Sequence, residues 1–171
     1  MPEITYLESS DDTEALAARL SEPVRRWFLD KCPDFTAPQK MAIPAIMDGE
    51  HLLLCSPTGS GKTLTAFLTV IDDLVRKALD GSLKDQVYCI YISPIKALAN
   101  DIERNLLGPL EEIKARYLPD RAKEIRVGLR TGDTSQSDRQ KMLRKPPHIL
   151  ITTPESMAIA VGSSRFQPIV S

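Results

Sequence analysis

The chain has 171 residues, of which 42% are hydrophobic and 26% charged, a composition that fits one globular domain with a substantial core. Its 22 Lys and Arg against 23 Asp and Glu give a net charge of -1, so any nucleic-acid binding must be local. No apolar run reaches the roughly 20 residues of a membrane span, and the acidic start is unlike a signal peptide, so we expect a soluble, cytoplasmic protein. Three cysteines without CxxC spacing and only two histidines argue against a disulfide framework or a zinc site.

Apolar patterning predicts helices first and then an alternation of strands and helices. Two helices are expected over 21–30 and 38–47, the second bent by Pro44. Four short apolar runs predict strands, at residues 51–55, 87–92, 125–129 and 148–152. Helical spacing separates them, at residues 64–79, 95–117 and 135–144. Since three of the runs are apolar almost throughout, we expect an α/β fold: an open, mainly parallel sheet with helices on both faces.

Charge is unevenly distributed along the chain. Residues 1–30 hold three Arg against seven acidic residues, whereas residues 121–145 hold eight basic against three acidic residues. A solvated helix face is the common explanation for such a basic stretch. The alternative is a surface patch that binds nucleic acid through Arg139, Lys141, Arg144 and Lys145.

The sequence SPTGSGKT, residues 56–63, follows the first predicted strand and opens a helix, which is the setting of a phosphate-binding loop. Gly59 and Gly61 let the backbone approach phosphate oxygens, while Lys62 reaches the terminal phosphates and the Thr63 hydroxyl would ligate Mg²⁺. The general pattern expects glycine where Ser56 stands, so the match is incomplete at one position. The alternative is a glycine-rich turn before a helix.

The sequence FTAPQ, residues 35–39, lies about twenty residues before that loop. Thr36 and Gln39 have the spacing of a capping box, with Pro38 in the first helical turn. A glutamine at this distance could instead present its amide to the N6 donor and N7 acceptor of adenine. Spacing alone favours the cap.

Three further motifs each follow a predicted strand: SPIKALAND (93–101), RTGDT (130–134) and TTPES (152–156). Because the strands are expected to be parallel, their carboxyl ends meet at one edge of the sheet, where open α/β folds bind ligands. Hydroxyls, amides and basic groups such as Lys96 suit a phosphodiester backbone there and would not read base edges. In TTPES, a helix N-cap at Thr153 followed by Pro154 is an equally good structural explanation.

FTAPQ, SPTGSGKT, SPIKALAND, RTGDT and ITTPES occur in this order between Phe35 and Ser156. With them, the chain resembles superfamily 2 helicases, and most closely the large helicase-related (Lhr) family of DNA helicases. The resemblance implies a RecA-like P-loop domain that binds ATP and Mg²⁺. It also implies that a small residue is accepted at Ser56 and that Gln39 reads the adenine base.

The resemblance further implies the residues of two binding sites. The nucleotide site would consist of Phe35, Gln39, Thr58, Gly59, Ser60, Gly61, Lys62 and Thr63. Within it, Lys62 and Thr63 would be the catalytic residues, with Thr63 as the Mg²⁺ ligand. A track for single-stranded DNA or RNA, contacted through the phosphate backbone, would consist of Pro94, Lys96, Asn100, Thr131, Gly132 and Thr153.

By the same resemblance, residues 1–34 form an N-terminal helical segment, and residues 35–171 form part of a first RecA-like domain that is truncated before an acidic DExH strand. The family also uses arginines of a second RecA-like domain, which we expect in the same full-length chain. The only similar acidic pair here is VIDD, residues 70–73, but it lies inside a predicted helix, on what we expect to be a solvated face. We therefore expect a fragment that does not hydrolyse ATP by itself.

The leading hypothesis is thus the ATP-binding part of an ATP-dependent DNA helicase, which couples ATP hydrolysis to translocation and strand separation. An RNA helicase is the nearest alternative, because phosphate contacts do not report the 2'-hydroxyl. A non-catalytic nucleotide-binding module is an alternative of a different class.

Overall fold

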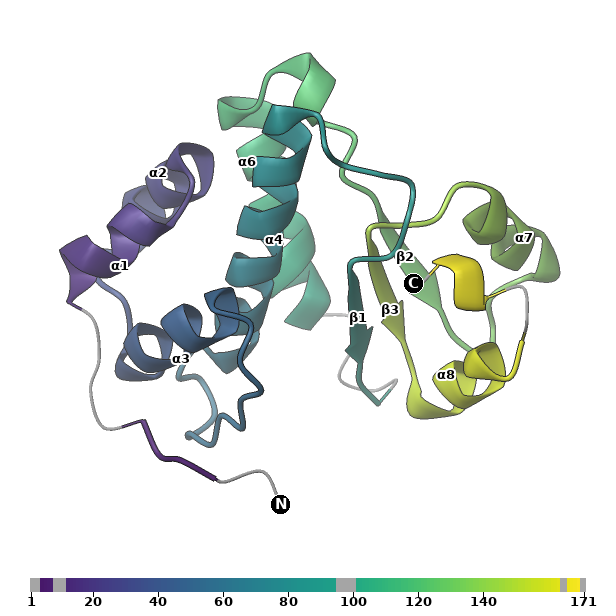
Figure 1. Ribbon diagram of the computed structural model, residues 1–171, viewed down its shortest axis with the longest axis horizontal. Coiled ribbons are helices and arrows are strands. Elements are labelled where there is room, and N and C mark those ends of the chain that lie inside the picture. Colours follow the sequence, from purple (N-terminus) through teal and green to yellow (C-terminus); the bar gives the residue numbers. More distant parts are fainter. Residues whose placement is uncertain (1–3, 8–11, 95–100, 164–165, 170–171) are drawn as a thin grey trace.

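The structure, a computed structural model, describes residues 4–7, 12–94, 101–163 and 166–169 (Figure 1). The α-helices are α1 (Thr13–Arg19), α2 (Glu22–Lys31), α3 (Ala37–Met47), α4 (Lys62–Asp80), α6 (Gly108–Tyr117), α7 (Gln136–Arg144) and α8 (Pro154–Val161). The strands are β1 (Cys89–Ile92), β2 (Val127–Arg130) and β3 (Ile149–Thr152). A π-helical segment, Glu103–Leu107, leads directly into α6, and short 3₁₀ segments lie at Asp120–Ala122 and Gln167–Ile169. Within the described ranges, no helix is both long and apolar enough to cross a membrane.

The three strands form a parallel sheet in the order β1-β3-β2. All four residues of the central strand β3 are buried, as expected for a strand with neighbours on both sides and helices on both faces. In the register of the sheet, Thr152 at the end of β3 pairs with Ile92 on one side and Arg130 on the other. The carboxyl ends of the strands therefore meet at one edge, which confirms the parallel open sheet expected from the sequence.

Alternate residues of β3 enter two different cores, one on each face of the sheet. Ile149 and Ile151 belong to a large cluster with residues of α4 and α6, whereas Leu150 packs with Ala160 of α8 and with Phe166. Accordingly, α4 and α7 lie on opposite sides of the sheet in Figure 1. This two-sided covering confirms the predicted doubly covered α/β architecture.

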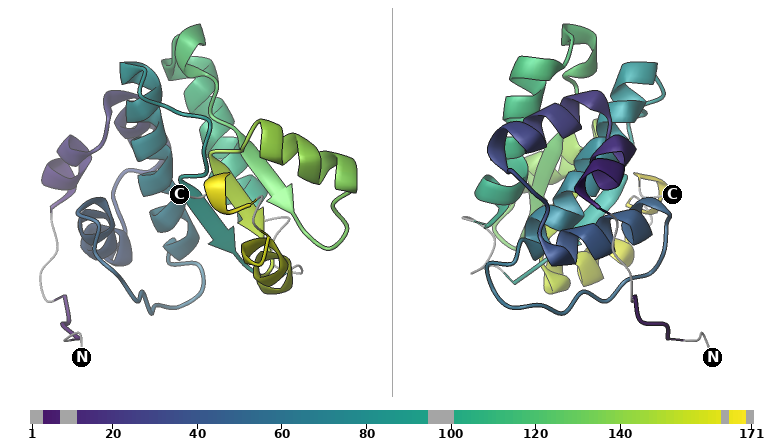
Figure 2. Two further views of the ribbon diagram at one scale, coloured as in Figure 1. Left: turned by 45° about the vertical axis from the view of Figure 1, so that its right-hand side comes forward. Right: turned by 90° about the vertical axis from the view of Figure 1, so that its left-hand side faces the viewer.

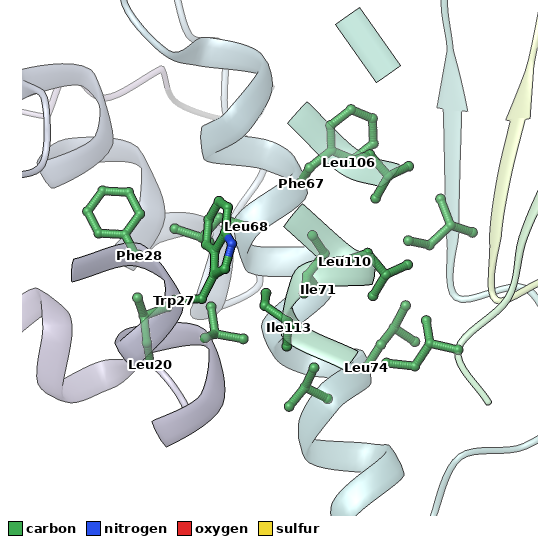
Figure 3. Packing of buried hydrophobic residues seen from close by; sticks show 14 of the residues in the cluster. Leu20, Trp27, Phe28, Phe67, Leu68, Ile71, Leu74, Leu106, Leu110 and Ile113 are labelled. Carbon is green, nitrogen blue, oxygen red and sulfur yellow. The ribbon is translucent and has the colours of Figure 1, made fainter. Parts of the chain in front are cut away.

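The helices α1 and α2 share the large core with the rest of the chain. Trp27 and Phe28 of α2 are buried in one cluster with Leu68 and Ile71 of α4, and the Trp27 side chain lies beside Leu68 (Figure 3). The right-hand view of Figure 2 looks onto α1 and α2, which lie across α4. The N-terminal segment is therefore packed onto the helix that follows the glycine-rich loop.

The acidic pair inside α4 differs from the sequence expectation at one of its two positions. Asp73 is exposed and pairs with Lys77, as a solvated helix face requires. Asp72 is instead buried, with 1% of its surface exposed, because its carboxylate pairs with Arg76 and accepts a backbone N–H from Ser21. The expectation of a solvated face is wrong for Asp72.

Most predicted elements are confirmed, with strands shorter than their apolar runs. The runs at 87–92, 125–129 and 148–152 contain β1, β2 and β3, and the helices expected over 21–30, 38–47, 64–79 and 135–144 correspond to α2, α3, α4 and α7. Of the helix expected over 95–117, residues 95–100 lie outside the described residues and 101–117 are helical. Helix α1 was not predicted, because its seven residues are too few to show a clear period.

The strand predicted at 51–55 is wrong. This apolar segment forms no regular element and joins no sheet among the described residues, and Leu53 is 87% exposed. A strand requires a neighbouring backbone to pair with, and the sheet formed by the described residues consists of β1, β3 and β2 alone. An apolar run indicates a preference for burial, but it does not show whether another strand lies beside it to pair with.

Candidate functional site

The glycine-rich loop runs directly into α4, whose N-cap is Gly61. Gly59 and Gly61 adopt the left-handed conformation, with φ of 82° and 87°. Gly61 supplies no side chain to cap the 19-residue helix, so the first N–H groups of α4 face the loop without a side-chain acceptor. Free N–H groups at the positive end of a helix dipole bind anions, so the loop fits a phosphate group.

The Lys62 ammonium group lies over this loop. Its Nζ donates to the carbonyl oxygens of Ser56 and Pro57, the latter at 2.6 Å. The hydroxyl groups of Ser56 and Ser60 lie 2.6 Å apart and connect the two ends of the turn. A serine at position 56 therefore takes part in the structure of the loop, where the general phosphate-loop pattern has glycine.

Thr63, in the first turn of α4, contacts an acidic residue of another motif. Its Oγ1 donates to Oδ2 of Asp101 at 3.3 Å, and Asp101 is the last residue of SPIKALAND. We did not predict Asp101 as a site residue, because nothing in its spacing from the loop indicates this contact. Across the ranges that the structure describes, no three His, Cys, Asp or Glu side chains are grouped closely enough to hold a metal ion.

The FTAPQ segment lies against the loop. The Thr36 N–H donates to Oε1 of Gln39 at 2.8 Å, and the Thr36 hydroxyl donates to the carbonyl of Ser60 at 3.0 Å. Gln39 is 3% exposed, and a Cβ atom on Gly61 would lie 3.0 Å from its Nε2. The predicted capping box is confirmed. Phe35 packs in the core with its ring stacked on Phe28 at 4.1 Å, so the structure does not present this ring at the loop surface.

The residues predicted for the nucleic-acid track follow the three strands at one edge. Pro94 and Gly132 are exposed there, and Thr131 is half-buried. Thr153 is buried, and its hydroxyl accepts the N–H of Ser156 at 3.3 Å, so the alternative of a helix cap is confirmed. Lys96 and Asn100 lie outside the described residues.

Two arginines stand beside the turn that follows β2. The Arg130 guanidinium lies 5.1 Å from the centroid of the Phe166 ring, in cation–π contact. Partial burial, together with the neighbouring charge of Arg139, lowers the pKa of Arg130. Two guanidinium groups and the exposed Asp133 carboxylate therefore lie at this turn, which leaves one net positive charge among these three residues.

Burial also shifts the pKa of a histidine at the opposite edge of the sheet, where the strands begin. His148 precedes β3, is buried, and accepts the backbone N–H of Arg126 at Nδ1. Burial, reinforced by the Arg126 charge, lowers its pKa to about 4. A neutral imidazole used in this way supports the strand and takes no part in the candidate site.

Comparisons with known proteins agree with these features. The sequence pattern of the DEAD/DEAH box helicase family matches residues 36–169. The chain is 49% identical to an ATP-dependent helicase Lhr-Core of Methanocaldococcus jannaschii, with all of this chain and 21% of that protein covered. It is 40% identical to an Lhr helicase/uracil glycosylase of Escherichia coli, with 91% of this chain and 10% of that protein covered.

The structure is similar to that of the Mycobacterium smegmatis helicase Lhr bound to ssDNA and AMP-PNP, with a TM-score of 0.75 and 41% identity over 88% of this chain and 19% of the other. A DEAD-box helicase bound to ssRNA shares the fold, with a TM-score of 0.70 at 20% identity, 92% of this chain and 31% of the other being covered. These matches confirm the resemblance to Lhr helicases and the RecA-like fold. The chain spans about a fifth, or less, of the length of the Lhr relatives.

Proposed function

The chain belongs to the DEAD/DEAH box helicase family, and we propose that it is the ATP-binding part of an ATP-dependent DNA helicase. In the longer protein, ATP hydrolysis would be coupled to translocation along single-stranded nucleic acid and to strand separation. The observation that carries the proposal is the contact between FTAPQ and the glycine-rich loop at the start of α4. Two motifs about twenty residues apart come together where a nucleotide would need them.

The residues around the loop fit a bound nucleotide. The N–H groups at the start of α4 and the turn made by Thr58, Gly59, Ser60 and Gly61 would surround the phosphates. Lys62 would exchange its contacts with the carbonyls of Ser56 and Pro57 for phosphate oxygens, which are better acceptors for an ammonium group. Gln39 would keep one lone pair of Oε1 on its helix cap and accept a hydrogen bond from the adenine N6 amino group with the other, while Nε2 would donate to N7.

Mg²⁺ would be held by the Thr63 hydroxyl and would neutralise charge that develops on the phosphates. For this, Thr63 must turn its oxygen from Asp101 toward the metal, and Asp101 remains as a neighbouring carboxylate. The sequence contains no DExH motif, so we propose that the carboxylates that position the attacking water, and the second RecA-like domain, belong to the longer protein.

A single strand of nucleic acid would lie along the carboxyl edge of the sheet. Pro94, Thr131 and Gly132 would contact phosphates, together with Lys96 and Asn100 of SPIKALAND. The predicted track residue Thr153 is buried, so we propose that it supports the track by capping α8. The similar Lhr helicase whose structure contains ssDNA supports DNA as the substrate. Since few phosphates are contacted, we expect a log–log salt dependence of about -1 to -3, at roughly -0.7 for each phosphate of a single strand.

Residues 35–171 would be part of the first RecA-like domain, and residues 1–34 a helical segment attached to it through α2 and α4. The longer protein would act in the cytoplasm.

Calorimetric titration of this chain with Mg-ADP tests the nucleotide site. We expect binding by the natural chain and loss of binding in Lys62→Ala. Lys77→Ala is the matched control, because Lys77 lies on the same helix but near its other end, paired with Asp73. Equal binding by the natural chain and Lys62→Ala would contradict the role of Lys62.

A further inference from the structure

Arg139, on α7, contacts the turn of RTGDT rather than solvent alone. One of its terminal nitrogens, Nη2, donates to the carbonyl oxygen of Thr131 at 3.3 Å and to that of Gly132 at 3.1 Å. None of the ion pairs between described residues includes Arg139. The guanidinium charge of Arg139 therefore interacts with backbone carbonyls of the turn, and no carboxylate among the described residues pairs with it.

The direction of these two carbonyls fixes the direction of two amides. In a trans peptide unit the C=O and the N–H point in opposite directions, and the described chain contains no cis peptide. Since the carbonyls of Thr131 and Gly132 point toward Arg139, the N–H groups of Gly132 and Asp133 point away from it. Within the described ranges no acceptor binds either N–H. Gly132 is exposed, and a Cβ atom added to it would meet nothing within 4 Å, so the space beside the turn is open.

The turn is also fixed from within. The Thr131 N–H donates to Oγ1 of Thr134 at 2.8 Å, which removes that N–H from contact with a ligand. The Thr131 carbonyl accepts the Thr134 N–H at 3.3 Å in addition to Nη2 of Arg139, whereas the Gly132 carbonyl accepts from Arg139. The two neighbouring N–H groups, of Gly132 and Asp133, remain free. Successive N–H groups that point to one side form a concave site for an anion. The positive charges of Arg130 and Arg139 beside it favour a phosphate further.

Lys141, another basic residue of the same helix, has different surroundings. The Lys141 side chain is 73% exposed and pairs with Asp138 at 2.8 Å, so it adds little net charge to the surface. The Arg139 side chain, in contrast, is half-buried: its Nε is buried without a hydrogen-bond partner among the described residues, and Nη2 makes both of its hydrogen bonds. Arg139 and Lys141 therefore have different surroundings, although they lie two positions apart in the basic segment.

We propose that Arg139 is a positioning residue of the nucleic-acid track: it holds the carbonyls of Thr131 and Gly132 so that the amides of Gly132 and Asp133 meet a phosphate of the bound strand. This inference rests on the proposed function, since the phosphate belongs to the nucleic acid proposed there. It assigns the amides as the phosphate ligands and gives Arg139 no contact with the strand.

Fluorescence anisotropy with labelled single-stranded oligo(dT), on this chain at several salt concentrations, tests the assignment. We expect Arg139→Ala to weaken binding by about tenfold or more, because charged hydrogen bonds to the turn are lost. We expect Arg139→Lys, which can still donate to both carbonyls, to retain most of the affinity. Lys141→Ala removes a charge from the same helix and is the matched control, for which we expect unchanged binding.

The salt dependence separates positioning from direct contact. A positioning residue changes the affinity but not the slope, whereas loss of a direct phosphate contact reduces the slope by about 0.7. Backbone resonances of Gly132 and Asp133 should move when oligo(dT) is added to the natural chain, and should move less in Arg139→Ala at the same oligo(dT) concentration. A folded Arg139→Ala variant that binds as tightly as the natural chain would overturn the positioning role alone. A natural chain that binds no single strand would overturn the proposed nucleic-acid track and the positioning role with it.

Discussion

The Oδ1 atom of Asp72 on α4 accepts the backbone N–H of Ser21 at 2.6 Å, at the point where α2 begins. The other carboxylate oxygen accepts from Nε of Arg76 at 2.7 Å, and Nη2 of Arg76 donates to the carbonyl of Arg19 at 2.6 Å. Ser21 is the N-cap residue of α2, so Asp72 holds the backbone at the residue where this helix begins. This network fastens the N-terminal helices to the helix that carries the phosphate loop.

We therefore predict that Asp72→Ala destabilises the chain by about 2 kcal/mol, because a buried N–H and the Arg76 guanidinium both lose their acceptor. Urea unfolding followed by circular dichroism measures the change. Asp73→Ala is the control, since Asp73 is exposed and its loss should change the free energy of unfolding by less than about 0.5 kcal/mol. Equal effects of the two substitutions would show that the network contributes nothing.

Because His148 is buried, we predict that the free energy of unfolding of the chain falls at acid pH. Its pKa in the folded chain is lowered to about 4, mainly because it is buried, whereas an unfolded histidine titrates near 6.5. The unfolded state therefore binds the proton first, so the stabilisation is complete above about pH 6.5 and is lost as the pH falls toward 4. The difference between the two pKa values corresponds to a loss of up to about 3 kcal/mol.

Urea unfolding between pH 7 and pH 4 tests this, with His148→Gln expected to flatten the decline over that window. The exposed His51 provides the control, because His51→Gln should leave the pH dependence as it is. If His148→Gln retained the full decline, other groups would be responsible for it.

We predict that alanine destabilises the chain more at Gly61 than at Gly59. Both have positive φ, so alanine strains the backbone by roughly 1–2 kcal/mol at either position. At Gly61, the new Cβ would also lie 3.0 Å from Nε2 of the buried Gln39, whereas at Gly59 it would meet nothing within 4 Å. We expect Gly61→Ala to lower the melting temperature more than Gly59→Ala, and calorimetry on the two variants measures the difference. A larger loss in Gly59→Ala would contradict the packing of Gln39 against the loop.

Because we assign two roles to Gln39, we predict that Gln39→Ala loses both stability and the preference for an adenine nucleotide. Gln39→Ala should lower the stability by about 1 kcal/mol through loss of the capping box, and should make ADP and GDP bind equally through loss of the amide. Thr36→Ala is the matched control, because it weakens the same cap but keeps the Gln39 amide. Binding titrations with both nucleotides measure the preference. If Gln39→Ala lost stability but still preferred ADP, Gln39 would be a cap only.

The sequence was informative where a local pattern determines the structure. The apolar runs at 87–92 and 148–152 indicated β1 and β3, the run at 125–129, which Arg126 interrupts, indicated β2, and the capping box at Thr36 and Gln39 was legible from its spacing. Asp72 was missed although its spacing of four from Leu68 and three from Val75 places it on the buried face of α4. Its partner Ser21 lies 51 positions away, which no local pattern indicates.

In the candidate site, too, local sequence patterns do not indicate which distant residues come into contact. Arg139 and Lys141 are two positions apart in one basic helix, and only the fold directs the first to the turn and the second to solvent. The contact between Thr63 and Asp101 likewise joins two motifs 38 positions apart. Motif spacing indicated which segments bind ligands, but not which side chains support them.

The final prediction is that this chain binds Mg-ATP without hydrolysing it. Thr63 is its proposed Mg²⁺ ligand, and the sequence has no DExH pair to orient water. A phosphate-release assay should give no signal above buffer, while Mg-ADP titration of the same sample shows that the site is intact. Phosphate release by the natural chain that disappears in Lys62→Ala would show that the chain contains its own catalytic carboxylate. Asp101, whose Oδ2 lies 3.3 Å from the Thr63 hydroxyl, would then be the first residue to substitute.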